Sequence, residues 1–267
     1  MKIVVCVKYV PDSTGDRHFE PDHTMDRSGV DGLLSELDEY AVEQALQIKE
    51  KQGDPDATEI TVLTIGPEDA TDAVRKALQM GADKGVHVLD EAIAGSDAPA
   101  TSLVLAEAVR KIGAESPWDL VMCGMASTDG SMGVLPAMLA ERLGVPAVTL
   151  GSEVSVDGDT LTIRRDGDTA TQTVEGTLPV VCSVTDQSGE ARYPSFKGIM
   201  AAKKKPVETW SLADLGVDPG VVGLSAAWTE VTGTEPRPPR TAGEIVTDED
   251  GSGAKALVEF LASKKFV

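Results

Sequence analysis

The stretch with the clearest capacity for chemistry is a glycine-rich segment near the middle of the chain. Residues 124–133 read Gly-Met-Ala-Ser-Thr-Asp-Gly-Ser-Met-Gly and lie between an apolar run and a segment with helical spacing. Glycine allows a ligand to approach the backbone closely, and the free N–H groups of a following helix would stabilise an anion such as phosphate. The segment contains neither the Gly-Lys-Ser/Thr of P-loops nor the Gly-x-Gly-x-x-Gly of dinucleotide sites. These residues therefore fit either a nucleotide-binding loop or an ordinary strand-to-helix connection.

Two further groups of reactive side chains give weaker indications. Histidines and carboxylates gather in a polar N-terminal segment as in some metal sites, although solvated charges explain them better: Asp16, His18, Glu20, Asp22 and His23. Cys6, Cys123 and Cys182 are far apart and lie in apolar runs. This favours core residues in a reducing cytoplasm over a disulfide framework or a zinc site. No serine or cysteine is spaced from a base in a way that would define a hydrolase.

The elements that must hold the glycine-rich segment alternate between strands and helices. Apolar or β-branched runs predict strands over residues 3–7, 59–65, 85–89, 119–123 and 145–150. Helical spacing and glycine stops predict helices over residues 37–51, 70–80, 99–112 and 135–143, the first of them capped by Ser35 or Asp38. This alternation predicts an α/β fold, a parallel twisted sheet with helices on both faces. Ligands of such sheets bind beyond the carboxyl ends of the strands, here residues 8–12, 65–67 and 124–133.

The pattern changes after residue 150. Asp157-Gly158-Asp159 and Asp166-Gly167-Asp168 separate short alternating strands, so residues 151–175 are predicted to form β-hairpins. The apolar run 178–184 returns to the sheet, the chain is loop-rich and extended from residue 191, and residues 255–264 form a short last helix. The dense basic run 203–205 is either a solvated turn or a contact for an acidic partner or a phosphate.

Net charge limits the classes of partner. The 267 residues include 24 Lys and Arg against 44 Asp and Glu, which gives a formal charge of −20. Such a chain repels nucleic acids and anionic membranes, so neither is expected as a direct ligand. The sequence has no apolar run of bilayer-spanning length, and its N-terminus alternates like a strand rather than a signal peptide. We therefore expect a cytoplasmic protein.

Acidity that is spread along the chain, with only 4% aromatic residues, predicts adaptation to salt and a halophilic archaeal source. At molar salt the Debye length falls to about 3 Å, so self-repulsion is screened. Lowering the salt to about 0.1 M should unfold the protein or dissociate its assembly, because unscreened repulsion destabilises compact states. Thermal melting followed by circular dichroism tests this, and a melting temperature that does not fall on desalting would contradict it.

Six motifs, in order, resemble the β subunits of electron transfer flavoproteins over nearly the whole chain. They are the opening IVVCVKYVPD, LDEYAVEQAL (37–46), ALQMGADKGVHV (77–88), TLTIRRDGDTATQTVEGTLPVVCSV (160–184), ARYPSFKGIMAAKKKPVETW (191–210) and RTAGEIV (240–246). The resemblance implies a core like that of adenine nucleotide alpha hydrolases over residues 1–190, hairpins included. It also implies a partner-docking loop with the Lys run at 191–210 and an arm, 211–267, that wraps on an α subunit.

The resemblance implies an FAD shared with the α subunit, near Leu37, and AMP or a second FAD held in the β subunit. The residues implied to bind cofactor are Cys6, Ser35, Glu36, Leu37, Asp38, Ile65, Gly124, Met125, Ala126, Ser127, Thr128, Asp129, Gly130, Ser131, Met132, Gly133 and Val134. Ser131, Met132 and Val134 stand where the family has Asp, Thr and Gln, which removes two side-chain donors. AMP, FAD and an emptied site therefore all stay open.

The implied role is that of an electron carrier subunit rather than an enzyme. Electrons would come from acyl-CoA dehydrogenase-type flavoproteins, as in fatty acid β-oxidation, and pass toward a membrane quinone reductase. The residues implied to dock these partners are Tyr193, Phe196, Ile199, Met200 and Lys203, with Phe196 as the apolar anchor. Two alternatives are a free-standing adenine-nucleotide-binding module of the stress-protein type and a nucleotide-hydrolysing or adenylating enzyme.

Overall fold

The computed structural model describes residues 1–54, 57–239, 243, 245–248 and 250–267. The chain divides into two units, Met1–Gly233 and Thr234–Val267, and the second contains helix α7 (Gly253–Ser263). The predicted boundaries at residues 190 and 210 concern which partner each segment meets, and they stay predictions. Most of the motif at 240–246 lies outside the described residues.

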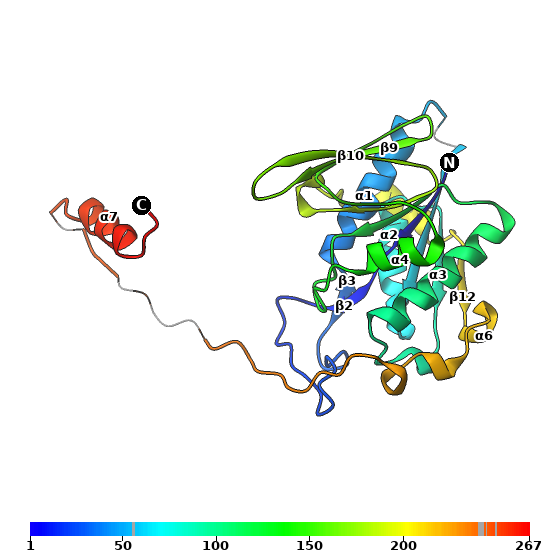
Figure 1. Cartoon of the computed structure of the whole chain (residues 1–267), viewed down its shortest axis with the longest axis horizontal. Coiled ribbons are helices and arrows are strands. Elements are labelled where there is room, and N and C mark those ends of the chain that lie inside the picture. Colours follow the sequence, from blue (N-terminus) through cyan, green and yellow to red (C-terminus); the bar gives the residue numbers. More distant parts are fainter. Residues whose placement is uncertain (55–56, 240–242, 244, 249) are drawn as a thin grey trace. The chain divides into compact units, whose positions relative to one another are not determined.

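Strand and helix alternate through the first part of the chain (Figure 1). The strands are β1 (Lys2–Cys6), β2 (Tyr9–Pro11), β3 (Gly32–Leu34), β4 (Glu59–Ile65), β5 (Lys84–Val88), β6 (Leu120–Gly124) and β7 (Ala147–Gly151). The helices are α1 (Glu36–Lys51), η2 (Glu68–Ala70), α2 (Thr71–Met80), η3 (Glu91–Ile93), α3 (Ala98–Glu115) and α4 (Leu135–Leu143). The predicted end of α3 at Gly113 is wrong. This glycine serves packing instead, because a Cβ there would lie 2.8 Å from Trp118 Cδ1.

Seven parallel strands form one sheet in the order β12-β5-β4-β1-β6-β11-β7. Side chains on one face of the sheet, such as Val5, pack with α1 and α2, and those on the other face, such as Val4, pack with α3 and α4. The predicted α/β class with helices on both faces is therefore confirmed. The chain runs from β1 to β4 and β5 on one side and then crosses to β6 on the other. Strand order thus reverses between β1 and β6, where open α/β sheets bind ligands.

The second half adds hairpins and a sheet edge. Strands β8 (Glu153–Asp157), β9 (Thr160–Asp166) and β10 (Thr171–Thr177) form a separate antiparallel sheet, as predicted, and β11 (Val180–Val184) returns between β6 and β7. The remaining elements are η4 (Asp186–Ser188), α5 (Phe196–Ala202), β12 (Val207–Trp210), α6 (Leu212–Leu215), η5 (Pro219–Val221) and η6 (Leu224–Ala226). Neither α5 nor β12 was predicted, because both are short and lack an alternating buried pattern.

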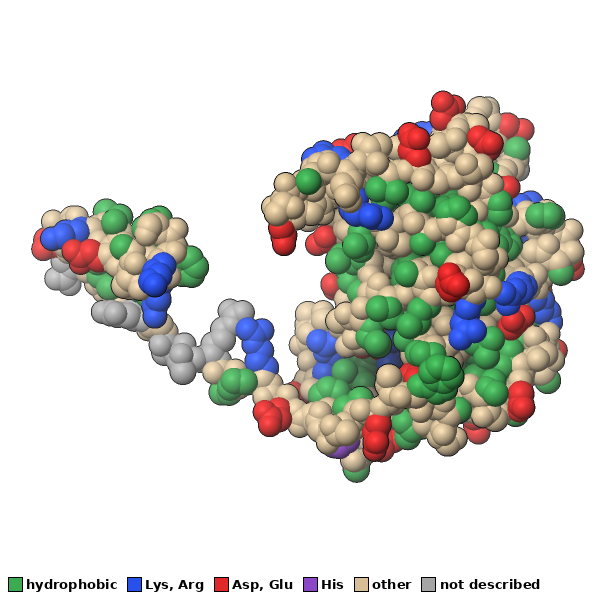
Figure 2. Space-filling model, in the orientation of Figure 1, with side chains coloured by type: hydrophobic (Ala, Val, Ile, Leu, Met, Phe, Trp, Pro, Cys, Tyr) green, Lys and Arg blue, Asp and Glu red, His purple; other side chains and the backbone are tan. Residues whose placement is uncertain are grey.

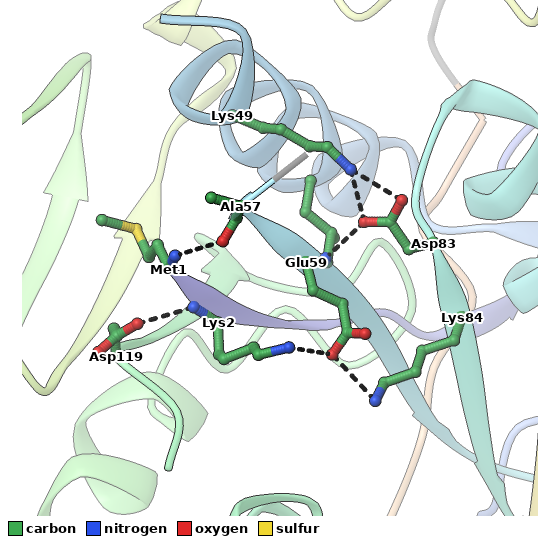
Figure 3. A network of polar contacts seen from close by, with 9 residues as sticks. Met1, Lys2, Lys49, Ala57, Glu59, Asp83, Lys84 and Asp119 are labelled. Carbon is green, nitrogen blue, oxygen red and sulfur yellow. Dashed lines mark hydrogen bonds and ion pairs between the residues drawn. The ribbon is translucent and has the colours of Figure 1, made fainter. Parts of the chain in front are cut away.

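Ion pairs join the strands at the amino ends of the sheet (Figure 3). Lys2 and Lys84 both contact Glu59 Oε1 at 3.0 Å, and Lys49 Nζ lies 2.7 Å from Asp83 Oδ2. Each of these carboxylates is neutralised by a lysine of a neighbouring element. The ion pairs at this end of the sheet therefore help to fix the register of the strands. Among the described residues, no helix has the length and apolar composition needed to cross a bilayer.

Candidate nucleotide site

A cavity of about 320 Å³ opens at the carboxyl ends of β1 and β6, where strand order reverses. This volume lies at the lower end of the range for small-molecule sites. The glycine-rich segment and the first turns of α3 and α4 close its sides. The lining residues are Cys6, Val7, Lys8, Asp38, Ile65, Ser96, Asp97, Ala98, Thr101, Leu105, Cys123, Gly124, Ala126, Ser127, Gly130, Met132, Gly133, Leu135, Pro136 and Leu139.

The cavity gathers many of the residues singled out in the sequence: Cys6, Asp38, Ile65, Gly124, Ala126, Ser127, Gly130, Met132 and Gly133. Their neighbours do not line it: Ser35, Glu36, Leu37, Met125, Thr128, Asp129, Ser131 and Val134. A cofactor role for either set stays a prediction. Sequence reasoning placed Lys8 at the ligand-binding end of its strand without naming it as a cofactor residue, and it missed Asp97 as a cavity residue. Asp97 carries a signal that would have found it, since it caps α3 by accepting the Ala100 N–H and precedes a proline.

Gly124 lies against the first turn of α1. A Cβ at this position would lie 2.6 Å from both the Leu37 carbonyl oxygen and Asp38 Oδ1, so only glycine allows β6 and α1 to approach this closely. Ser35 is the N-cap residue, as predicted, but its side chain makes no capping bond. The Ser35 hydroxyl is buried without a hydrogen-bond partner among the described residues.

The Asp38 carboxyl is buried in the wall of the cavity. Its Oδ2 accepts the Lys8 backbone N–H at 2.8 Å. Burial raises the pKa of Asp38 to about 7, and the N–H groups of Lys8 and Gly124 together with the Lys8 charge offset only part of this rise. A carboxyl with this pKa changes charge close to neutral pH.

Asp129 holds the glycine-rich segment through ion pairs. Its Oδ2 lies 2.9 Å from Lys8 Nζ and 2.5 Å from Arg27 Nη2, and its Oδ1 accepts the Gly130 N–H at 2.7 Å. Burial by itself would raise the pKa of Asp129, but Lys8, the Ser127 hydroxyl and Arg27 outweigh it and lower this pKa well below its usual range. Asp129 is therefore ionised, and its charge organises the loop.

Three basic side chains lie beside this loop. Arg17 Nη1 donates to the Thr128 carbonyl oxygen at 3.0 Å, so the long segment 12–31 contacts the glycine-rich segment through Arg17 as well as Arg27. Lys8 and Arg27 are paired with Asp129, and of the three basic residues only Lys8 lines the cavity, together with Asp38 and Asp97. The Lys8 ammonium is therefore the group in this wall that would attract an anionic ligand.

The histidine-rich part of segment 12–31 forms its own contacts. His18 Nε2 lies 2.8 Å from Asp26 Oδ2. Asp26 also accepts the N–H groups of Ser28 and Gly29, both at 2.9 Å, so this carboxylate shapes the loop. Across the parts of the chain that are described, no three His, Cys, Asp or Glu side chains are grouped so as to hold a metal ion.

Exposed apolar side chains also gather at residues 193–203, which we call the docking segment. Tyr193 is 90% and Phe196 81% exposed, and Ile199, Met200 and Lys203 are exposed beside them. Large apolar side chains gathered on a surface are typical of a protein contact. Of the basic run, Lys205 is tied down, since its Nζ donates to the Leu78 carbonyl oxygen at 2.9 Å.

Comparison with known proteins places this chain in a family. A model of the electron transfer flavoprotein domain matches residues 22–215. The chain is 47% identical over 267 residues to the electron transfer flavoprotein subunit beta of Mycobacterium bovis, with 99% of each chain covered. The chain belongs to the family of electron transfer flavoprotein β subunits.

Two more distant relatives of this β subunit agree. Subunit beta of Megasphaera elsdenii is 32% identical over 267 residues, covering 99% of this chain and 97% of the relative. A protein of Acetobacterium woodii, named Caffeyl-CoA reductase-Etf complex subunit CarD, is 33% identical over 264 residues with the same coverage. The family resemblance is thus confirmed, and the chain is an electron transfer subunit.

These relatives are bacterial, so the expected archaeal origin has no support from them. The acidity of the chain does not depend on this question of origin. Figure 2 shows Asp and Glu side chains scattered over the visible face rather than gathered in one patch. A salt requirement therefore stays a prediction about this β subunit.

Proposed function

We propose that this β subunit holds an adenine nucleotide in the cavity between β1 and β6 and joins an α subunit to complete the site of a redox FAD. The observation that best supports this proposal is the cavity, which has a glycine-rich loop and Lys8 on one side and apolar walls on the other. Ile65, Leu105 and Leu139 suit the face of a base, while the loop N–H groups and Lys8 suit a phosphate. The small volume of the cavity favours AMP, or the AMP portion of a second FAD.

The α subunit would cover surfaces that this chain leaves exposed. Helix α7 has no buried residue, and Leu257, Val258 and Phe260 stand on its surface. Figure 2 shows hydrophobic side chains, in green, on the surface of the C-terminal unit. Leu37 at the start of α1 would come near the shared FAD, as the family resemblance implies. The bound flavin supplies the redox chemistry, and this chain contributes position and electrostatics.

The docking segment would receive the partner dehydrogenase, with Phe196 as its anchor. The name of the Acetobacterium woodii relative places that protein in a complex with a reductase of an acyl-CoA. By analogy, an acyl-CoA dehydrogenase-type flavoprotein of fatty acid β-oxidation would reduce this complex in the cytoplasm. The complex would then pass the electrons to a membrane quinone reductase.

Counting cofactors tests the proposal. After co-expression with its α subunit, denaturation of the purified heterodimer should release one FAD and one AMP, or two FAD, per dimer. The β subunit expressed alone is the control, because it separates the nucleotide held by β from the flavin that needs both chains. Release of a single FAD and no other nucleotide would contradict the nucleotide site. A heterodimer that a dehydrogenase cannot reduce would contradict electron transfer, and a β monomer that binds ATP tightly would favour the free-standing module.

A further inference from the structure

Arg192 joins the start of the docking segment to helix α1. Its Nε and Nη2 lie 2.6 Å and 3.0 Å from the two carboxylate oxygens of Glu43. Its Nη1 and Nη2 lie 2.5 Å and 3.0 Å from those of Glu50. One planar guanidinium thus bridges two carboxylates that are two helical turns apart, an arrangement that an ammonium group cannot reproduce.

Burial and charge show that this contact is specific. The Glu43 side chain is 6% exposed, and although burial opposes it, hydrogen bonds from Arg192 lower the pKa of Glu43. Both carboxylates raise the pKa of Arg192, so the cluster is fully ionised at neutral pH. A second tie lies nearby, because Gln44 Nε2 donates to the Ser188 carbonyl oxygen at 2.7 Å. Helix α1 therefore holds the chain just before the docking segment at two points.

The docking segment itself is held on its other side through α5, which Ser195 caps. Tyr193 follows Arg192 directly and Phe196 comes four residues after it, and both are almost fully exposed. Further along, α5 packs on α2, and a Cβ on Gly198 would lie 2.4 Å from the Gln79 carbonyl oxygen. The contact of Arg192 with α1 and the contact of Gly198 with α2 thus lie on either side of the exposed aromatic pair in the chain. The first turn of α1 carries Asp38 to the cavity, so the same helix sets the position of both functional surfaces.

We infer that Arg192 is a positioning residue for partner docking: its bridge to Glu43 and Glu50 holds Tyr193 and Phe196 in the orientation that the partner flavoprotein recognises. The inference rests on the proposed docking role of this segment. Preorganised contact residues lower the entropy cost of association, so losing the bridge weakens binding more than it changes the chemistry.

The test uses the complete heterodimer and a purified acyl-CoA dehydrogenase in its reduced state. Arg192→Gln should raise the KM for the dehydrogenase about tenfold, the loss expected for a bidentate charged contact, while kcat and flavin content stay unchanged. Arg192→Lys should give an intermediate KM. Hydrogen exchange of residues 193–202 should become faster in Arg192→Gln than in the wild type. The matched control is Arg75→Gln on α2, an arginine that is 66% exposed and pairs with Asp72 of its own helix.

The variant Phe196→Ala distinguishes the positioning role of Arg192 from the docking role of the segment. If Phe196→Ala raises the KM but Arg192→Gln does not, the positioning role is wrong and docking stands. If Phe196→Ala also leaves the KM unchanged, docking through this segment is wrong. A raised KM with unchanged hydrogen exchange would overturn positioning in favour of direct contact by Arg192. Loss of flavin in Arg192→Gln would overturn it in favour of a general structural role.

Discussion

Replacing Gly124 with alanine should destabilise the protein and deprive the heterodimer of its second nucleotide. The added Cβ would meet the Leu37 carbonyl oxygen and Asp38 Oδ1 at 2.6 Å, far inside van der Waals contact. Neither neighbour is free to retreat, since Leu37 lies in the first turn of α1 and the Asp38 carboxyl is buried. Overpacking of this kind costs about 1–3 kcal/mol, which exceeds the gain of about 0.4–1 kcal/mol from a less flexible unfolded chain. We expect a net loss of about 1 kcal/mol.

Urea unfolding and nucleotide counting of the purified heterodimer measure this effect. Gly53→Ala is the matched control, because Gly53 is exposed outside the cavity lining and no atom would lie within 4 Å of its added Cβ. The control should keep both the stability and the nucleotide of the wild type. Equal stabilities and equal nucleotide contents for the two variants would show that the approach of β6 to α1 does not shape the cavity.

Asp38→Asn should remove a pH dependence from the stability of the protein. The pKa of Asp38 is about 7 in the folded chain, against an ordinary value of 3.8. Between these pH values the folded state keeps a proton that the unfolded state releases. The resulting stabilisation is complete below pH 3.8 and is lost as the pH rises through about 7. Over the whole window the change amounts to about 4 kcal/mol, at 1.36 kcal/mol for each pH unit.

Unfolding free energies measured at two pH values test the sign of this pH dependence. Between about pH 5 and about pH 8 the wild type should lose about 3 kcal/mol more than Asp38→Asn does. Asp186→Asn, which replaces an exposed aspartate after β11, should follow the wild type instead. The idea fails if Asp38→Asn and the wild type lose the same amount of stability over this range. Equal losses would mean that the carboxyl stays charged in the folded state over this range.

Secondary structure follows from local pattern wherever a segment has its own period and its own stop. Helix α4 ends as predicted because Gly144, at φ 71°, takes the left-handed conformation that closes a helix. The Asp-Gly turns correctly predict β8, β9 and β10. Strand β12 has no such pattern, since it is a strand only through its pairing with β5, which begins with Val207 opposite Gly85. Pairing with an open sheet edge depends on residues far away in the chain.

The same division holds for the functional surfaces. The glycine-rich segment, its place after a buried strand and its family motifs are properties of neighbouring residues, so the sequence alone determined the fold class, the family and the region of the cavity. Only the tertiary structure decided that Lys8 meets Asp129, 121 residues later, and that Arg192 meets Glu43, 149 residues earlier. It also decided that Asp38 is buried rather than solvated. Contacts and burial of this kind depend on how the helices pack against the sheet, which no local spacing specifies.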